Sequence, residues 1–200
     1  MVLLISMPKT KYAIDLYRKL SKPMMNSIVI QSRNLPVKIL LKLMNVTIEF
    51  SNNCNSTWTP PLEDCKRWIN AALNDIAMDC DFSVCLRFVE PEEAGELNKN
   101  YRGKDKATNV LSFPANFPDK LSETLQYRPL GDIVICPQLV ECEAKEQGKQ
   151  LEAHWAHMLI HGALHLSGFD HSNESETELM ETHEVNTLEN LGFPNPYLIG

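Results

Sequence analysis

Apolar and polar residues follow the pattern of β-strands in four short stretches of the chain. Residues 46–50 alternate apolar and polar side chains, as a half-buried strand does. Residues 82–89, 110–113 and 130–136 are short, mostly apolar runs bounded by prolines or polar residues. The sequence therefore predicts about four strands.

Apolar residues recur at helical spacing between and after these strands. One such pattern begins after the Pro60–Pro61 pair, and the last two patterns each end at a glycine, Gly168 and Gly192. The predicted helices cover 62–76, 91–101, a segment from Pro137 that Gly148 interrupts, 151–166 and 174–191. These elements predict an α+β fold in which a small mixed sheet of about four strands packs with helices.

The first 43 residues differ in charge from the rest of the chain. They carry eight basic residues and one acidic residue, which leaves 11 of 19 basic and 25 of 26 acidic residues in 44–200, a net charge of −14 there. We expect 1–43 to be an N-terminal extension, disordered or upstream of the true start, and 44–200 to form a single domain. An organelle transit peptide is the alternative for 1–43.

The composition is that of an ordinary globular protein, with 44% hydrophobic and 22% charged residues. No apolar run approaches the roughly eighteen residues that a membrane-spanning helix needs, so we expect no membrane association. The six cysteines form no C-x-x-C pair and are expected to be reduced core residues of a cytoplasmic protein. Because the main body is acidic, binding of a polyanion would require a local cationic patch or a metal ion.

Three histidines at the end of the 151–166 helix have the spacing of metal ligands. His161 and His165 are four residues apart, which places both imidazoles on one helical face. Gly168 permits a left-handed turn that brings His171 back toward them. Three imidazoles leave the fourth position of a tetrahedral zinc ion open, as in catalytic sites. The sequence predicts one Zn²⁺ on the long helix and the following loop, with a metal-free polar face or a structural zinc as the alternatives.

The same spacing occurs in metzincin peptidases, so peptide hydrolysis has to be considered. Those enzymes carry a glutamate directly after the first histidine, where it acts as general base. Gly162 occupies that position here. Peptidase chemistry would need a base from elsewhere, and the sequence therefore disfavours it.

The segment HGALHLSGFDH resembles the signature of the YbeY family of metal-dependent endoribonucleases. The resemblance extends to ELNKNYRGKDKATNVLSFP, LGDIVIC and ETHEVNTLENLGFPNPY and so covers most of 44–200, but not the first 43 residues. Ala107, Asn109 and Phe169 stand where the family usually has proline, aspartate and tyrosine.

The resemblance implies a function and a set of ligands. It implies a zinc-dependent endoribonuclease that is specific for single-stranded RNA and acts in 3′-end maturation of small-subunit ribosomal RNA and in ribosome quality control. Its partners would be ribosomal RNA and the ribosome. The three histidines of the family motif, which bind zinc, correspond to His161, His165 and His171.

A basic loop precedes the third predicted strand and is the candidate site for RNA phosphates. Lys99, Arg102, Lys104 and Lys106 concentrate positive charge in an acidic body. Arg102 is the favoured residue, because a guanidinium can bind two phosphate oxygens and because the resemblance places the family's functional arginine there. We expect the metal helix to face this loop across a cleft.

Other polar residues near the motif have less defined roles. Asp170 is a candidate to orient a ligand imidazole or to accept a proton from a bound water, with a solvated turn residue as the alternative. His154 and His157 are expected to support the ligands rather than bind the metal, and His183 is expected at the surface.

Two other functions remain open from the sequence. One is a zinc hydrolase of another class, such as a metallopeptidase. The other is a ribosome assembly factor that holds its metal structurally and cleaves nothing. For the endoribonuclease itself, the zinc ion either acidifies a water molecule or polarises a phosphoryl oxygen for attack by the RNA 2′-hydroxyl.

Overall fold

The computed structural model describes residues 45–55, 58–76, 81–116 and 127–198. The predicted N-terminal extension, 1–43, lies outside the described residues, as does most of the predicted excursion between the third and fourth strands. In chain order the elements are β1 (Val46–Asn52), α2 (Leu62–Asp75), β2 (Phe82–Phe88), α3 (Pro91–Arg102), β3 (Val110–Pro114), β4 (Arg128–Ile135), α5 (Pro137–Glu146), α6 (Leu151–Leu166) and α7 (Glu174–Asn190).

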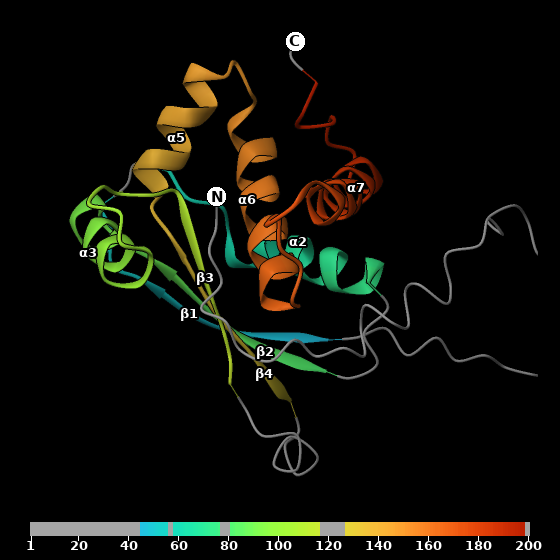
Figure 1. The fold of residues 1–200 in the computed structure, drawn as a ribbon, viewed down its shortest axis with the longest axis horizontal. Coiled ribbons are helices and arrows are strands. Elements are labelled where there is room, and N and C mark those ends of the chain that lie inside the picture. Colours follow the sequence, from blue (N-terminus) through green and yellow to red (C-terminus); the bar gives the residue numbers. More distant parts are fainter. Residues whose placement is uncertain (1–44, 56–57, 77–80, 117–126, 199–200) are drawn as a thin grey trace, which may run out of the picture. The chain divides into compact units, whose positions relative to one another are not determined.

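The four strands form one sheet in the order β1-β2-β4-β3 (Figure 1). β1, β2 and β4 run parallel to one another, and β3 pairs antiparallel with β4. The helix α2 forms the crossover between β1 and β2, and the chain passes through α3 and β3 between β2 and β4. β3 is an edge strand, and it pairs with β4, the strand that follows it in the chain. The predicted α+β fold with a small mixed sheet is confirmed.

The larger core lies on the sheet face covered by α2 and α6. Alternate strand residues such as Ile133 and Ile135 point into it, where they meet Trp68 of α2 and Trp155 and Leu159 of α6, all fully buried. Burial of this much apolar surface is the main source of stability, at about 25 cal/mol per Å². It also fixes α6 firmly against the sheet.

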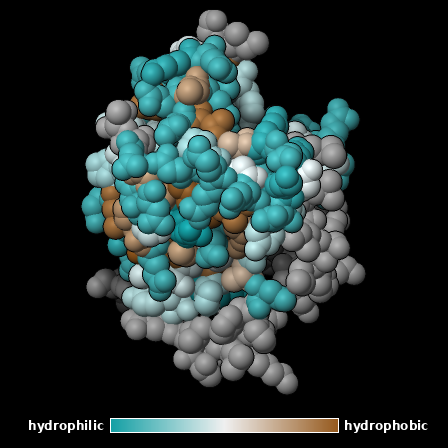
Figure 2. Space-filling model, turned by 90° about the vertical axis from the view of Figure 1, so that its left-hand side faces the viewer, coloured by the Kyte–Doolittle hydropathy of each residue, from teal (hydrophilic) through white to brown (hydrophobic). Residues whose placement is uncertain are grey.

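The opposite face of the sheet carries a smaller core under α3. Leu111 of β3 and Val134 of β4 point to this side, together with Ala94 and Leu97 of α3. Figure 2 shows the side of the molecule on which α3 lies in Figure 1, and its surface is largely hydrophilic. The sheet thus separates α3 from α6.

The helix α6 is buried on nearly all sides, because it lies between the sheet, α5 and α7. Twelve of its sixteen residues are buried, and His161 is one of the four that are not. Within the described residues, no helix is long and apolar enough to cross a membrane. The apolar character of α6 is that of a core helix.

Five of the six cysteines lie in the described part of the chain, and all five are free thiols. Cys65 and Cys136 are buried core residues, as predicted, and burial raises the pKa of the Cys65 thiol to about 12. Cys142 is exposed on α5, so the prediction of a core position was wrong for it.

Candidate metal centre

The predicted ligands His161, His165 and His171 come together at the C-terminal end of α6. One ring nitrogen from each lies within 4.8 Å of the others, which is close enough for one ion to contact all three. His161 and His165 are one helical turn apart, and their Nε2 atoms are 3.0 Å from each other. The geometry has the form of a three-histidine metal site.

The turn after α6 delivers the third histidine. Gly168 adopts a left-handed backbone with φ of 93°, and its N–H donates to the carbonyl of His165, while the N–H of Phe169 donates to the carbonyl of Leu164. These two bonds form a Schellman motif, which ends a helix and reverses the chain. His171 is thereby carried back to within ring contact of His165, with centroids 5.1 Å apart.

The far nitrogens of two of these imidazoles have defined partners. His165 Nδ1 donates to the carbonyl of Phe169 at 2.9 Å, and His161 Nδ1 donates to Glu184 Oε1 at 2.6 Å. A carbonyl and a carboxylate can only accept, so both Nδ1 atoms carry the hydrogen. In the neutral rings the Nε2 lone pairs of His161 and His165 therefore face each other.

Two lone pairs at 3.0 Å repel unless a proton or a cation lies between them. Burial and the neighbouring His161 lower the pKa of His165 to about 4, so this ring is neutral at pH 7. Burial lowers the pKa of His171 as well. Neutral imidazoles are the form that binds metal, and ligands at about 2.0–2.1 Å from a tetrahedral Zn²⁺ are about 3.3 Å apart. The donor set therefore fits a metal ion.

Glu184 of α7 connects several groups behind His161. Its side chain is fully buried, and Oε2 accepts from His157 Nε2 at 3.3 Å and from the hydroxyl of Tyr197. Burial alone would raise the pKa of this carboxyl, but the hydrogen bonds from His157 and His161 outweigh it and hold the pKa below its usual range. Glu184 is thus an ionised acceptor inside the protein.

His157, His161 and Glu184 form a second group whose polar atoms lie within 4.8 Å. The 2.6 Å between His161 Nδ1 and Glu184 Oε1 is a hydrogen-bond distance and is too short for two ligands of one ion. This group is a hydrogen-bonded network that supports the three-histidine group. His157 accordingly lies where a supporting residue was predicted.

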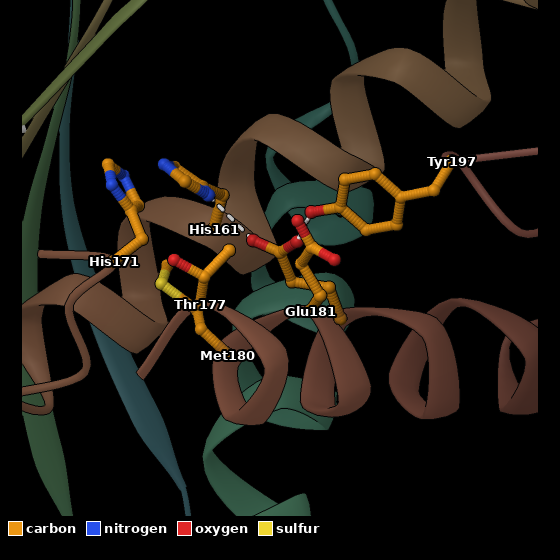
Figure 3. A pocket seen from close by; sticks show the side chains of 7 residues that line it. His161, His171, Thr177, Met180, Glu181 and Tyr197 are labelled. Carbon is orange, nitrogen blue, oxygen red and sulfur yellow. Dashed lines mark hydrogen bonds and ion pairs between the residues drawn. The ribbon is translucent and has the colours of Figure 1, made fainter. Parts of the chain in front are cut away.

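A small cavity of about 60 Å³ opens beside His161 and His171 (Figure 3). Its other walls come from α7 and the C-terminal turn, through Thr177, Met180, Glu181, Glu184 and Tyr197. The cavity suits a few ordered water molecules and is too small for a nucleotide. RNA would have to approach the histidines from outside it.

Asp170 lies in the turn between Gly168 and His171 and stabilises that turn. Its Oδ1 accepts from the backbone N–H of His171 at 2.8 Å, and its Oδ2 accepts from the hydroxyl of Ser172. The carboxylate that accepts a hydrogen bond from one of the three imidazoles is Glu184, whereas Asp170 bonds a backbone N–H and a hydroxyl. A part for Asp170 in proton transfer stays a prediction.

Gly162 faces the sheet and not the ligands. A Cβ at this position would lie 3.2 Å from Ser112 Oγ and from a methyl carbon of Ile133, and the Gly162 carbonyl accepts from the Ser112 hydroxyl at 3.2 Å. The helix can approach β3 and β4 this closely because residue 162 has no side chain. A glutamate there, as in the peptidases, would be pressed into the core.

Arg102 is the last residue of α3, on the other face of the sheet. Gly103 caps the helix, and the side-chain amide of Asn98 donates to the carbonyl of Lys106 at 2.7 Å, which fixes the basic loop. Partial burial lowers the pKa of the Arg102 guanidinium, which stays charged at neutral pH. Lys99 pairs with Asp105 at 2.8 Å on the surface.

The end of the basic loop contacts α5 and α6 through Asn109. The Asn109 amide donates to Glu143 Oε2 at 2.9 Å and lies 3.4 Å from Met158 Sδ, while the same Glu143 oxygen bonds His154 at 3.1 Å. The predicted cleft between the basic residues of the loop and the metal helix stays a prediction. The sheet lies between α3 and α6, and the loop joins α6 by packed contacts around the β3 edge.

His183 is buried, contrary to the predicted surface position. Its Nδ1 donates to Asp75 Oδ2 of α2 at 2.5 Å. The prediction failed because α7 packs against both α6 and α2 (Figure 1). His183 contacts α2, while Glu184 contacts α6.

The residues that sequence reasoning missed are Glu184 and Tyr197. Both belong to the C-terminal segment that resembles the YbeY family, but neither has a regular spacing relative to the histidines. Only the packing of α7 on α6 brings them to the site.

The chain is similar to known endoribonucleases over most of its length. The family model described as Endoribonuclease YbeY matches residues 47–192. Endoribonuclease YbeY of Stutzerimonas stutzeri is 50% identical over 151 residues, covering 75% of this chain and 91% of that protein. The protein of the same name from Colwellia psychrerythraea is 45% identical over 153 residues, covering 76% of this chain and 96% of that one.

One solved structure is also similar. The solution structure of TM1509 from Thermotoga maritima is 26% identical, covers 73% of this chain and 92% of that one, and superposes with a TM-score of 0.46. The family match and the identities of the relatives confirm the resemblance inferred from the motifs: the chain belongs to the Endoribonuclease YbeY family.

Proposed function

We propose that this protein is a zinc-dependent endoribonuclease that cleaves single-stranded RNA, with ribosomal RNA as its substrate. The observation that carries the proposal is the pair of Nε2 atoms of His161 and His165, 3.0 Å apart, each with its Nδ1 hydrogen donated elsewhere. With His171 they offer three imidazoles and no further protein ligand is needed, a donor set that suits Zn²⁺ with an open position.

The residues around the ion would have separate roles in RNA binding and in proton transfer. Zinc, when bound, supplies a Lewis acid that polarises a phosphoryl oxygen or acidifies a water molecule. Arg102 and the basic loop would bind RNA phosphates, since a guanidinium pairs with two phosphate oxygens. Asp170, next to His171, would hold that ligand's backbone and serve as a proton acceptor.

We propose the cellular role from the family resemblance, and the names of the relatives and the charge pattern support its RNA-cleaving part. The relatives are named endoribonucleases, and the acidic body confines RNA contacts to the basic loop and the metal centre. We assign the protein to 3′-end maturation of small-subunit ribosomal RNA and to ribosome quality control in the cytoplasm, with the ribosome as partner.

The test joins metal analysis to RNA cleavage. Purified wild type, His161→Ala and the control His154→Gln are analysed for zinc and then given labelled single-stranded RNA, duplex RNA and casein. We expect about one zinc per chain and cleavage of single-stranded RNA alone. His161→Ala should lose both the metal and at least a hundredfold of the cleavage rate, since a ligand is removed.

The control changes His154, which the sequence predicted to support the ligands but whose Nε2 lies 3.1 Å from Glu143 of α5, whereas His157 and His161 bond Glu184. It should keep its zinc and its cleavage rate. Cleavage of casein with intact RNA would establish a peptidase instead, and zinc binding without any cleavage would establish a non-catalytic assembly factor.

A further inference from the structure

We propose that Glu184 and Tyr197 are positioning residues for the metal ligand His161, so that the C-terminal turn of the chain is a working part of the metal centre. The inference rests on the proposed metal site at the three histidines. It assigns a role to two residues outside the histidine motif.

The carboxylate of Glu184 is fully buried. A buried carboxylate is costly unless hydrogen bonds compensate it, so its position is informative. Oε1 accepts from His161 Nδ1 at 2.6 Å, the bond marked in Figure 3. The bond fixes His161 in the tautomer whose Nε2 lone pair faces His165, and a negative acceptor increases the basicity of that lone pair.

Tyr197 lies seven residues beyond the end of α7 and contacts Glu184. Its hydroxyl donates to the other oxygen of Glu184, and its ring packs edge-on against His157, with centroids 5.6 Å apart. The backbone N–H of Tyr197 donates to Asn195 Oδ1 at 2.9 Å, which holds the turn. Tyr197 and His157 thereby prevent rotation of the carboxylate away from His161.

The bond between His183 and Asp75 allows a positioning role of Glu184 to be distinguished from a role in stabilising α7. A comparable bond between a buried histidine and a carboxylate joins His183 of α7 to Asp75 of α2, and the His183 ring packs against Phe169, with centroids 5.0 Å apart. If Glu184 only stabilised α7, breaking either bond would have the same consequences. If Glu184 positions His161, only its loss changes the metal centre.

The experiment compares Glu184→Gln, Tyr197→Phe and the matched control Asp75→Asn in the full chain. Zinc affinity is measured by competition with a chromophoric chelator, and ¹⁵N NMR of the imidazoles reads the His161 tautomer in metal-free protein. We expect affinity to fall about 10–100-fold in Glu184→Gln and about 2–5-fold in Tyr197→Phe. In Glu184→Gln the single Nδ1–H tautomer should become a mixture, and Asp75→Asn should match wild type in both measurements.

The inference would be overturned if Glu184→Gln kept the zinc affinity and the His161 tautomer of the wild type. It would also be overturned if the wild type bound two zinc ions per chain and Glu184→Gln bound one, because Glu184 would then be a metal ligand itself. If Glu184→Gln does not fold, Tyr197→Phe decides, because it removes one hydroxyl from a side chain that is 43% exposed. Failure of the proposed function is distinguishable, since it would appear in the wild type itself, as absence of zinc or as absence of RNA cleavage, and not as a difference between the wild type and Glu184→Gln.

Discussion

The two faces of the sheet hold the two halves of the proposed chemistry in different ways. On the α6 face, the histidines lie in a packed core, and two of them have both ring nitrogens placed by a buried or backbone partner. On the α3 face, the basic loop lies at the surface, and its Lys99–Asp105 pair is more than half exposed. The side-chain positions of the histidines are fixed on the α6 face, and the charged side chains of the basic loop are exposed on the α3 face.

This difference matches what each half must do. A metal ion tolerates only small errors in ligand position, so its ligands need buried neighbours that hold their orientation. A flexible polyanion is attracted over several ångströms, so its binding site needs exposed charge more than rigid placement. Changes on the α6 face should therefore have larger effects than comparable changes on the α3 face.

The largest effect is expected from Gly162→Glu. The new carboxylate would be forced against Ser112 and Ile133, so we expect the free energy of unfolding to fall by more than about 3 kcal/mol, with no gain of peptidase activity. Urea denaturation measures the free energy of unfolding, and a casein assay measures peptidase activity. The matched control is Gly95→Glu in α3, where a Cβ meets its nearest neighbour at 3.5 Å and the change should be about 1 kcal/mol or less. Equal decreases in the free energy of unfolding for Gly162→Glu and Gly95→Glu would refute the contrast between the two faces of the sheet.

The next effect is acid sensitivity of the metal-free protein. The pKa of His165 is about 4 in the folded chain and 6.5 in the unfolded chain, so folding favours the neutral ring. This stability is present above pH 6.5 and is lost as the pH falls through 4, a decrease of roughly 3 kcal/mol. Urea denaturation at pH 7, 5.5 and 4 after chelation tests it. His165→Asn should show a shallower decrease, and an unchanged slope would contradict the prediction.

A smaller effect is expected from Arg102→Ala. Loss of a charge-assisted contact to phosphate should lower RNA cleavage about 10–100-fold, corresponding to about 1.5–3 kcal/mol, while the zinc content stays at the wild-type value. Cleavage kinetics across a salt series, with zinc analysis of the same samples, measure both. Loss of zinc in this variant would show that the two faces are not separable.

The smallest effect is expected from Lys99→Ala. Its ion pair with Asp105 is exposed, and such pairs contribute little, so the free energy of unfolding should change by less than about 0.5 kcal/mol. A double-mutant cycle with Asp105→Ala isolates the pair. A coupling energy above about 1 kcal/mol would mean that the loop is held as rigidly as the metal face.

Local signals in the sequence predicted much of the fold and the histidine group. The bounds of α6 agree with the prediction because apolar spacing, Gly168 and the ligand spacing of His161 and His165 all act within one helix and its cap. The strands were similarly predictable, because prolines and polar residues bound them.

What could not be predicted depends on packing between distant elements. Glu184 and His183 are neighbours on α7, yet one contacts α6 and the other contacts α2, and no periodicity in α7 indicates this. Likewise, nothing local reveals that α3 and α6 cover opposite faces of the sheet. Side-chain networks that join several elements are set by tertiary packing alone.

The opposed nitrogens of His161 and His165 have a consequence for the protein as a whole. In the language of energy landscapes they are a locally frustrated contact, which the rest of the fold holds in place and a bound ion relieves. If the proposed zinc ion binds there, ion binding and folding become one linked equilibrium, in which free zinc would raise the folded population by mass action. A shortage of zinc would reduce the amount of folded protein as well as its activity. The amount of this protein would then depend on the supply of zinc.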